Sequence, residues 1–279
     1  MKTLKDKVVV ITGAGSGIGR ALAVNCAQRG SLLALSDVNE AGLAETVELV
    51  KQAGAAEVRS DRLDVADREA FQTYAAAVAE QFGRVNVVIN NAGVALAGDL
   101  TDLSYEDMDW IVSINFWGVV HGTKEFLPHL IESGDGHVVN LSSLFGMIAM
   151  PGQSAYNATK FAVRGMTEAL REEMLIAGHK VGVTSVHPGG IKTAIARNAR
   201  VSEHEDKEAT AKLFDEKLAT MSPDKAAEII VKGILKNQAR VLVGLDAHAL
   251  HNFQKFTGSR YQDIIALASK RLMPGKKVV

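Results

Sequence analysis

The stretch that decides the fold is TGAGSGIG, residues 12–19, in which glycine stands at positions 13, 15, 17 and 19. It follows a β-branched run, VVVIT (8–12), and precedes an apolar stretch of helical spacing, RALAVNCA (20–27). A strand, a glycine-rich turn and a helix in this order present backbone N–H groups at a helix N-terminus, where a phosphate can bind. Glycine supplies positive φ and lets an anion approach the backbone, so the stretch predicts a turn that holds a diphosphate.

The spacing of these glycines narrows the kind of turn. Gly13, Gly17 and Gly19 fit the pattern G-x-x-x-G-x-G, whereas the pattern G-x-G-x-x-G would require glycine at Ile18 or Arg20. No G-K-[ST] triplet follows, which argues against a nucleoside triphosphate P-loop. A glycine turn without a ligand remains the alternative interpretation at this point.

Short apolar runs alternate with helical patterns along the rest of the chain. We expect seven strands, at residues 8–12, 32–36, 56–60, 85–90, 137–142, 181–186 and 240–244. Apolar residues at helical spacing lie between them, as in 67–82 and 222–237, and Ser222 with Pro223 marks a helix start. This alternation implies a single α/β domain, residues 1–279, with a parallel sheet and right-handed crossovers.

The composition fits an ordinary globular protein. The chain has 279 residues, 47% of them hydrophobic, and a net charge of −1. No overall basic field draws it to nucleic acid or to an anionic membrane, and we expect neither partner. No run approaches the ~20 apolar residues of a membrane span, and glycines interrupt the first apolar run before it could serve as a secretion signal. We therefore expect a cytoplasmic location.

Cysteine and histidine residues give no sign of a metal site. The single cysteine, Cys26, lies in an apolar helical stretch and is interpreted as buried filler. His121, His137 and His187 do not have the spacing of metal ligands, and we expect no metal. We interpret His187, beside the PGG turn at 188–190, as structural.

Two segments depart from the strand–helix rhythm. Residues 194–221 are polar and charge-mixed, and no strand is expected in them. They follow the end of a strand, so they form either a solvated helix pair or a flap that covers the substrate. Residues 246–279 are expected to form a C-terminal helical tail.

Acidic residues after two strands suggest how a nucleotide is held. Asp37 ends the second strand, 18 residues beyond Gly19 (37 − 19), where a carboxylate can accept from both ribose hydroxyls. Its sequence neighbours are not basic, and neither is Ser16 in the glycine turn, which favours NAD over NADP. A cap of the next helix is the alternative for Asp37. Asp64 suits the adenine amino group or a turn equally well.

The motif SAYNATKFAV places a phenol and an amine one helical turn apart. Tyr156 and Lys160 are at i and i+4, so a helix puts both on one face. A phenol has a pKa near ~10, and a nearby ammonium favours its ionised form. A lowering of two to three units corresponds to about 3–4 kcal/mol and suits general acid–base work. Ser143 ends a strand 13 residues earlier (156 − 143) and could hold a substrate oxygen.

Taken together and in this order, the motifs resemble those of the short-chain dehydrogenase/reductase family. The pieces that carry the resemblance are TGAGSGIG, Asp64, NNAG (90–93), Asn115, Ser143, YNATK (156–160) and PGGIKT (188–193), which span roughly residues 5–245. The resemblance implies a Rossmann-type domain whose seven parallel strands have the order 3-2-1-4-5-6-7, with helices on both faces. It also implies hydride transfer to or from a nicotinamide.

The same resemblance assigns roles to individual residues. Tyr156 moves the proton, Ser143 orients the reacting oxygen, and Lys160 lowers the pKa of the phenol and binds the nicotinamide ribose. Asn115 holds, through its backbone, a water of a proton relay. The family's S-x-x-G register selects Ser143 rather than Ser142. The residues expected to bind NAD are Gly13, Ser16, Gly17, Ile18, Gly19, Asp37, Asp64, Val65, Asn91, Ala92, Gly93, Tyr156, Lys160, Pro188, Gly189, Ile191 and Thr193.

The substrate is expected to be a secondary alcohol or ketone with apolar substituents. Phe145, Met147, Ile148 and Met150 follow the predicted catalytic serine and line either an apolar pocket or the core. The family implies a homotetramer or homodimer. Two other functions stay open, an NADP-dependent carbonyl reductase and a non-catalytic nucleotide-binding regulator.

Overall fold

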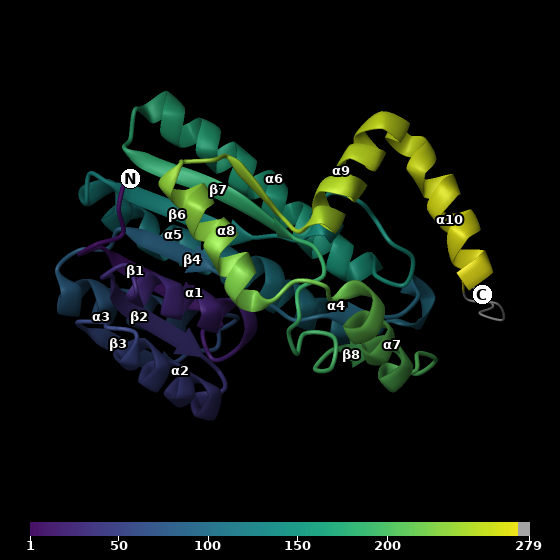
Figure 1. Cartoon of the computed structure of the whole chain (residues 1–279), viewed down its shortest axis with the longest axis horizontal. Helices are drawn as coiled ribbons and strands as arrows, with labels where there is room; N and C mark the ends of the chain where they lie inside the picture. The colour runs from purple at the N-terminus through teal and green to yellow at the C-terminus, as the bar shows by residue number, and fades with distance from the viewer. Residues whose placement is uncertain (273–279) are drawn as a thin grey trace.

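The computed structural model describes residues 1–272, and all seven expected strands lie in one parallel sheet (Figure 1). In spatial order they are β3 (Val58–Arg62), β2 (Leu32–Asp37), β1 (Val8–Thr12), β4 (Val87–Asn90), β6 (Gly136–Leu141), β7 (Val181–Pro188) and β9 (Arg240–Val243). Counted along the chain, these strands have the predicted order 3-2-1-4-5-6-7. The labels β5 and β8 belong to a separate two-stranded ribbon.

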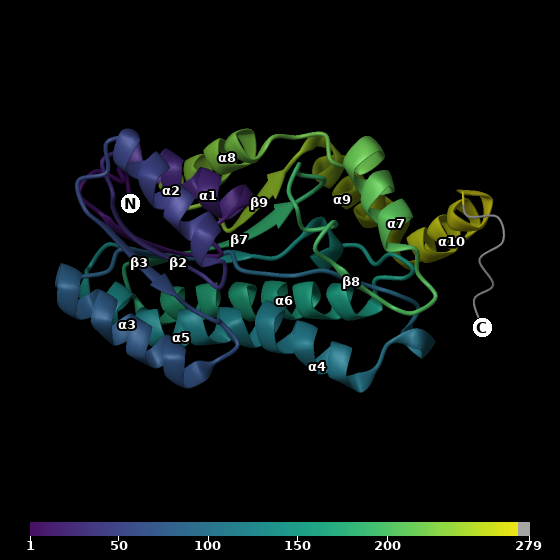
Figure 2. The ribbon, with the colours of Figure 1, turned by 90° about the horizontal axis from the view of Figure 1, so that it is seen from below.

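Helices cover both faces of the sheet, which explains why its central strands are buried and mostly apolar. Figure 2 shows α1 (Gly17–Ala27), α2 (Glu40–Gln52) and α8 (Pro223–Leu235) on one face. The other face carries α3 (Arg68–Phe82), α5 (Gly118–Glu132) and α6 (Ser154–Ala177). Every residue of β1, β4 and β6 is buried, as expected for strands covered on both sides.

Side chains placed before the helices fix where several of them begin. Asp67 accepts from the backbone N–H of Ala70 at the start of α3, and Ser222 accepts from Lys225 at the start of α8. The cap of α2 is Asn39, which accepts from Gly42. The alternative interpretation of Asp37 as the cap of this helix is therefore wrong.

A π-helical turn interrupts the long helix that precedes β6. The α4 helix (Tyr105–Val112) continues into the π turn η2 (Ser113–Trp117) and then into α5. Single π turns inside α-helices are often found at functional sites. This one contains Asn115.

Residues 194–221 contain a strand, so the expectation that they would contain none is wrong. β8 (Arg200–Val201) pairs in parallel with β5 (Leu96–Ala97), far away in sequence. The guanidinium of Arg200 lies 3.9 Å from the centre of the Trp110 ring, and its Nη1 lies 3.1 Å from Asp107 Oδ1. These long-range contacts hold Arg200 and Val201 in an extended conformation, which no local sequence pattern predicts. The rest of the segment includes α7 (Lys207–Leu213) and the π turn η4 (Phe214–Leu218).

The C-terminal segment forms the expected helices. They are α9 (Leu245–Thr257) and α10 (Tyr261–Leu272), joined by the 3₁₀ turn η5 (Gly258–Arg260), and Figure 1 shows them at the edge of the molecule. The Tyr261 hydroxyl accepts from the backbone N–H of Ala149, which ties α10 to the loop after β6. Residues 273–279 of the predicted tail lie outside the described residues.

Cys26 is fully buried in α1, and burial raises the pKa of its thiol to about 12, as expected for a packing residue.

Within residues 1–272, no helix is both long and apolar enough to cross a bilayer. No group of three or more His, Cys, Asp or Glu side chains in that part of the chain could hold a metal ion.

Two histidines of the sheet are buried and neutral. The Nε2 of His137 lies 2.8 Å from Thr184 Oγ1, and the Nδ1 of His187 lies 2.9 Å from the Ser143 carbonyl oxygen. Burial lowers the pKa of His137 to about 3 and that of His187 to about 4, from an ordinary value of 6.5. The unfolded chain therefore binds more protons than the folded chain between pH 6.5 and about 4, and acidification favours unfolding.

We expect the free energy of unfolding to fall between pH 6.5 and pH 5 as these two imidazoles are forced to stay neutral. Each contributes up to about 1.4 kcal/mol per pH unit well below its unfolded-state pKa. Urea denaturation of His137→Asn should show a weaker dependence on pH than the parent chain, and His179→Asn, at an exposed position, should not. Equal slopes in all three proteins would contradict the prediction.

Candidate functional site

The glycine turn has the geometry of an anion-binding helix start. Gly13 and Gly17 have positive φ values of 66° and 53°. Ser16, the N-cap of α1, makes no capping hydrogen bond through its side chain, and the first turn of α1 carries no acidic residue. The first N–H groups of α1 thus have no capping side chain, and a diphosphate fits there.

Two of the glycines are required by the chain itself, which the sequence did not indicate. A Cβ at Gly19 would lie 2.0 Å from the Gly13 carbonyl oxygen and 2.5 Å from Asn91 Nδ2. A Cβ at Gly15 would lie 2.9 Å from the carboxyl group of Asp37. Backbone and side chains of the protein therefore approach these positions closely, in addition to any ligand.

The NNAG segment is fastened to the glycine turn. The Thr12 hydroxyl oxygen accepts from the backbone N–H groups of Asn91 and Ala92, both at 3.1 Å. The Asn91 amide donates to the carbonyls of Thr12 (2.9 Å) and Gly13 (3.0 Å). Asn91 thereby joins the ends of β1 and β4.

Asp37 ends β2 and faces the glycine turn. Its Oδ2 accepts from Gly15 N–H (2.8 Å), and its Oδ1 accepts from Asn39 N–H (2.9 Å). A carboxylate has about four lone-pair sites, so acceptor capacity for ribose hydroxyls remains. The sheet also pairs Asp37 with Arg62, an exposed basic residue that the sequence neighbours of Asp37 did not reveal; its Nε lies 3.5 Å from Glu40 Oε1.

Asp64 and Val65 lie at the end of β3. Asp64 is exposed, and its Oδ1 accepts from the backbone N–H of Ala66 (2.9 Å), so the interpretation as a turn residue has direct support. Val65 is buried, and its carbonyl oxygen lies 3.0 Å from His121 Nδ1. A turn role leaves the remaining acceptor sites of Asp64 available to an adenine amino group.

The predicted catalytic side chains meet where β6 ends against α6. Lys160 is buried, and its Nζ donates to the Leu141 carbonyl oxygen (3.1 Å). The Ser142 hydroxyl donates to the carbonyl oxygen of Lys160 (2.7 Å), which turns Ser142 away from Tyr156. The Ser143 hydroxyl, not that of Ser142, is the one that acts on the pKa of Tyr156.

The Tyr156 phenol is influenced by burial and by one hydroxyl. Burial raises its pKa, and the nearby Ser143 hydroxyl opposes that rise. Lys160 Nζ lies 5.6 Å from the centre of the Tyr156 ring, so the two side chains do share one face, as predicted. Burial lowers the pKa of Lys160 to about 8. In the chain by itself the phenol pKa thus moves upward, opposite to the expected direction, because burial outweighs the favourable groups.

Asn115 links three segments of the site. It is fully buried; its Oδ1 accepts from Val94 N–H (2.8 Å) and its Nδ2 donates to the Val94 carbonyl (2.9 Å). A Cβ at Gly93 would lie 3.2 Å from Asn115 Oδ1 and 3.4 Å from Lys160 Nζ. The NNAG segment, the π turn and the Lys160 side chain therefore lie in contact.

The PGGIKT segment reaches the glycine turn from the other side. A Cβ at Gly17 would lie 3.0 Å from the Thr193 methyl group, so these two segments lie next to each other. Asp246, at the start of α9, accepts from Gly190 N–H (2.7 Å) and fixes the turn after Pro188 and Gly189. Ile191 is buried in the main core. If Ile191 binds NAD, as expected from the resemblance, its backbone would make the contact.

Only part of the expected apolar substrate pocket lies at the site. Phe145 packs edge-on against Tyr156, with ring centres 6.2 Å apart. Met147 and Ile148 are buried, so they belong to the core rather than to a pocket wall. Met150 is partly exposed. The alternative of core packing, left open from the sequence, holds for two of the four residues.

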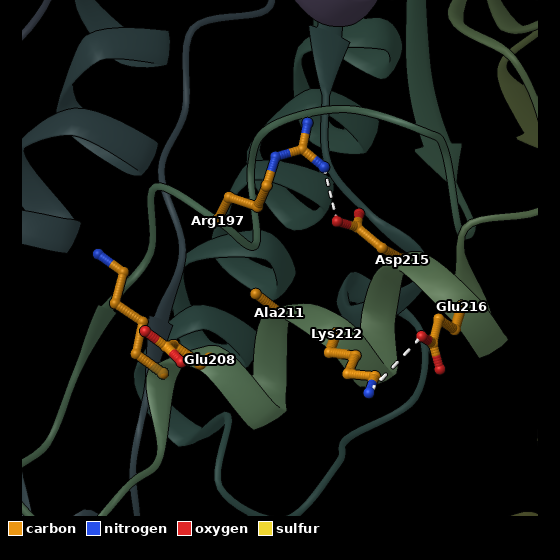
Figure 3. A pocket seen from close by; sticks show the side chains of 7 residues that line it. Arg197, Glu208, Ala211, Lys212, Asp215 and Glu216 are labelled. Atoms are coloured by element: carbon orange, nitrogen blue, oxygen red, sulfur yellow. Dashed lines mark hydrogen bonds and ion pairs between the residues drawn. The ribbon is translucent and has the colours of Figure 1, made fainter.

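An open hollow is lined by side chains of the 194–221 segment (Figure 3). Two ion pairs lie in it: Arg197 Nη1 is 2.6 Å from Asp215 Oδ2, and Lys212 Nζ is 4.0 Å from Glu216 Oε1. Ser143 and Tyr156 are not among the residues that line this hollow.

Sequence reasoning missed several supporting residues. Arg20 donates to the carbonyls of Gly15 (2.6 Å) and Gly42 (3.0 Å) and pairs with Glu45. Asp246 and Thr12 hold the two loops described above. Thr12 stands inside the quoted stretch and could have been noticed there, whereas the partners of Arg20 and Asp246 are fixed only by the fold.

Comparison with known proteins agrees with this geometry. Residues 7–204 match the family model described as short chain dehydrogenase. The chain is similar to SadH of Mycobacterium tuberculosis, which is named an oxidoreductase, with 57% identity over 99% of this chain and 100% of the relative. It is 35% identical to the oxidoreductase EphD of the same organism over 90% of this chain, which spans 43% of that longer protein.

Solved structures show the same architecture. A short-chain dehydrogenase/reductase from Burkholderia phymatum in complex with NAD has 32% identity and a TM-score of 0.85, over 92% of this chain and 95% of that one. An alcohol dehydrogenase from Thermococcus sibiricus complexed with 5-hydroxy-NADP has 30% identity and a TM-score of 0.71, over 86% and 95%. The chain belongs to the short-chain dehydrogenase/reductase family and is an oxidoreductase of that family.

The confinement of Gly19 predicts a defect that needs no ligand. In Gly19→Ala, overpacking against Gly13 and Asn91 should lower the free energy of unfolding by about 2 kcal/mol or more, measured without nucleotide. Gly165→Ala is the control, because no heavy atom lies within 4 Å of a Cβ on this helical glycine, and it should be neutral or stabilising. An unchanged melting temperature in Gly19→Ala would refute the packing role.

Proposed function

We propose that this protein is an NAD-dependent dehydrogenase of secondary alcohols, acting also as a reductase of the matching ketones. The observation that carries the proposal is that Ser143, Tyr156 and Lys160 lie close together, with Lys160 beside Gly93. Gly93 belongs to the NNAG segment, which is hydrogen-bonded to the glycine turn. A nucleotide-binding regulator has no need of a buried ammonium next to a phenol, so this arrangement favours an enzyme.

Bound NAD would supply the hydride acceptor, and the protein's own residues would handle the oxygen and its proton. The Ser143 hydroxyl lies near enough to Tyr156 to affect the pKa of the phenol, and an alcohol oxygen that binds both would be oriented by Ser143. As the carbinol C–H bond gives up its hydride, the O–H proton passes to the Tyr156 oxygen and a carbonyl remains. The positive charge of Lys160 favours the ionised phenol that this transfer needs.

The chain by itself holds the phenol protonated, because burial raises the pKa of Tyr156. The proposal therefore assigns the lowering of that pKa to the loaded site, where an oxidised nicotinamide adds positive charge. Lys160 lies 5.6 Å from the phenol ring and would also bind the nicotinamide ribose. Asn115, in the π turn, would hold the relay water through its backbone.

The choice of NAD rests on Asp37 at the end of β2. A carboxylate there accepts from ribose hydroxyls and repels a 2′-phosphate. The nearby cations are engaged, since Arg20 pairs with Glu45 and Arg62 lies beside Glu40. An NAD complex among the structural neighbours supports this choice, and the 5-hydroxy-NADP complex of another neighbour keeps the NADP-dependent carbonyl reductase as the second candidate.

The edge of Phe145 on Tyr156 favours a substrate with apolar substituents. Residues 194–221 would cover that substrate as a flap, anchored by the β5–β8 ribbon and by Arg200 on Trp110. A homotetramer or homodimer and a cytoplasmic location complete the proposal.

Tyr156→Phe should keep the affinity for NADH while turnover falls by about 10²–10⁴-fold, because it removes only the proton-carrying oxygen. Oxidation of a panel of secondary alcohols, followed at 340 nm, and NADH fluorescence titration measure the two properties. Tyr74→Phe, the same change in the core on the α3 side, is the control and should retain turnover. Retained turnover in Tyr156→Phe would overturn the assignment.

Asp37→Asn should reduce the preference for NADH over NADPH by about tenfold or more, because it removes the charge that repels a 2′-phosphate. The amide keeps one of the two oxygens that accept from Gly15 N–H and Asn39 N–H, and urea denaturation of the variant checks that it is folded. Fluorescence titration with both cofactors measures the ratio, and Glu48→Gln on the exposed face of α2 should leave it unchanged. The choice of NAD fails if the parent protein binds NADPH at least as tightly as NADH.

A further inference from the structure

His187 is buried at the end of β7 with both ring nitrogens occupied. Its Nδ1 lies 2.9 Å from the carbonyl oxygen of Ser143, and its Nε2 lies 2.9 Å from the Ser185 hydroxyl oxygen. The exposed fraction of His187 and of Ser185 is 0%. The interpretation of His187 as structural therefore needs a more specific statement, because its partner is the backbone of a predicted catalytic residue.

The partners determine which tautomer is present. A carbonyl oxygen only accepts, so Nδ1 must carry the proton that is donated to Ser143. Nε2 is then an acceptor in the neutral ring, and the Ser185 hydroxyl donates to it. Burial lowers the pKa of His187 to about 4, which keeps the ring neutral and this direction fixed.

The imidazole supplies a hydrogen bond that the backbone of β7 cannot. Ser142 N–H donates to the Val186 carbonyl (2.9 Å), which continues the ladder between β6 and β7. In a parallel ladder every second residue of a strand donates, so the next donor from β7 would be residue 188. That residue is proline, which has no N–H. The side chain of His187 reaches across instead and holds the following residue, Ser143.

The conformation of Ser143 decides where its hydroxyl lies. Its backbone is extended, with φ −164° and ψ 166°, and its carbonyl oxygen also accepts from Gly146 N–H (3.0 Å). Its hydroxyl oxygen accepts from Phe145 N–H (3.1 Å), and the same hydroxyl acts on the pKa of Tyr156. Rotation of the peptide plane after Ser143 would move these groups together.

We propose that His187 is a positioning residue. Its Nδ1–H holds the Ser143 carbonyl, and this keeps the Ser143 hydroxyl beside the Tyr156 phenol. The proposal rests on the proposed function for its kinetic consequence and on the hydrogen bonds alone for its structural one. The buried residue before the PGG turn would thus contribute to the reaction through Ser143.

A matched pair of variants separates the hydrogen bond from the packing. Asn and Leu are nearly isosteric, and Asn carries its amide nitrogen at the same bond separation from Cα as His Nδ1. Both variants leave the same space unfilled, but only His187→Asn retains a donor for the Ser143 carbonyl. We expect His187→Leu to lower kcat by roughly tenfold or more and His187→Asn to restore most of it, with NADH affinity unchanged in both.

A second readout needs no turnover. Because the Ser143 hydroxyl opposes the rise in the Tyr156 pKa, spectroscopic titration of the phenol should move to higher pH in His187→Leu and return in His187→Asn. The Tyr156→Phe variant identifies which tyrosine signal is observed. If the protein does not oxidise secondary alcohols, and the proposed function therefore fails, this titration still tests the position of the Ser143 hydroxyl.

Nitrogen-15 NMR of the imidazoles tests the tautomer in the parent protein, even if the variants fail to fold. The resonance of His187 is the one that disappears in His187→Asn. If that variant does not fold, it is the one that remains after each of the other histidines has been assigned by substitution. A neutral ring protonated at Nδ1 is expected. A ring protonated at Nε2, or equal kcat and equal phenol titration in the Leu and Asn variants, would overturn the proposal.

Discussion

Two hydrogen bonds in opposite directions hold the end of β6 against the first turns of α6. Lys160 Nζ donates to the Leu141 carbonyl, and the Ser142 hydroxyl donates to the Lys160 carbonyl. Gly146 permits the approach, since a Cβ there would lie 2.1 Å from Ser142 Oγ. The rest of the site depends on this clamp, because it brings the loop with Ser143 and the helix with Tyr156 together. The hydroxyl of the neighbouring Ser142 is engaged in one of these two hydrogen bonds.

The clamp places an ammonium where burial disfavours its charge. Burial lowers the pKa of Lys160 to about 8, and its Nζ lies close to Gly93 and Asn115 as well as to the phenol. A fold selected for stability alone would place an apolar side chain there. The cost indicates a use, and the resemblance to oxidoreductases at 57% identity over nearly the whole chain agrees with it.

The glycine turn serves the chain as much as any ligand. Gly13 and Gly17 supply positive φ, whereas Gly19 and Gly15 are glycine because Gly13, Asn91 and Asp37 crowd them. Asp37 connects these roles, because its carboxylate holds Gly15 N–H and Asn39 N–H while it faces the same turn. Local packing and the proposed recognition of the nucleotide therefore involve the same loop.

From the sequence alone we predicted the seven strands, the helix start at Ser222 and the shared face of Tyr156 and Lys160, whereas the strand order was implied by the resemblance to a known family. The strands, the helix start and the shared face follow from local patterns, in which the residues that decide the outcome are neighbours along the chain. Only the tertiary structure decided that Arg62 lies beside Asp37, that Arg200 binds Trp110 to extend β8, and that His187 holds Ser143. It also decided that burial raises rather than lowers the pKa of Tyr156 in the chain alone. These outcomes depend on desolvation and on residues that are far apart in sequence, and neither quantity is contained in a local pattern.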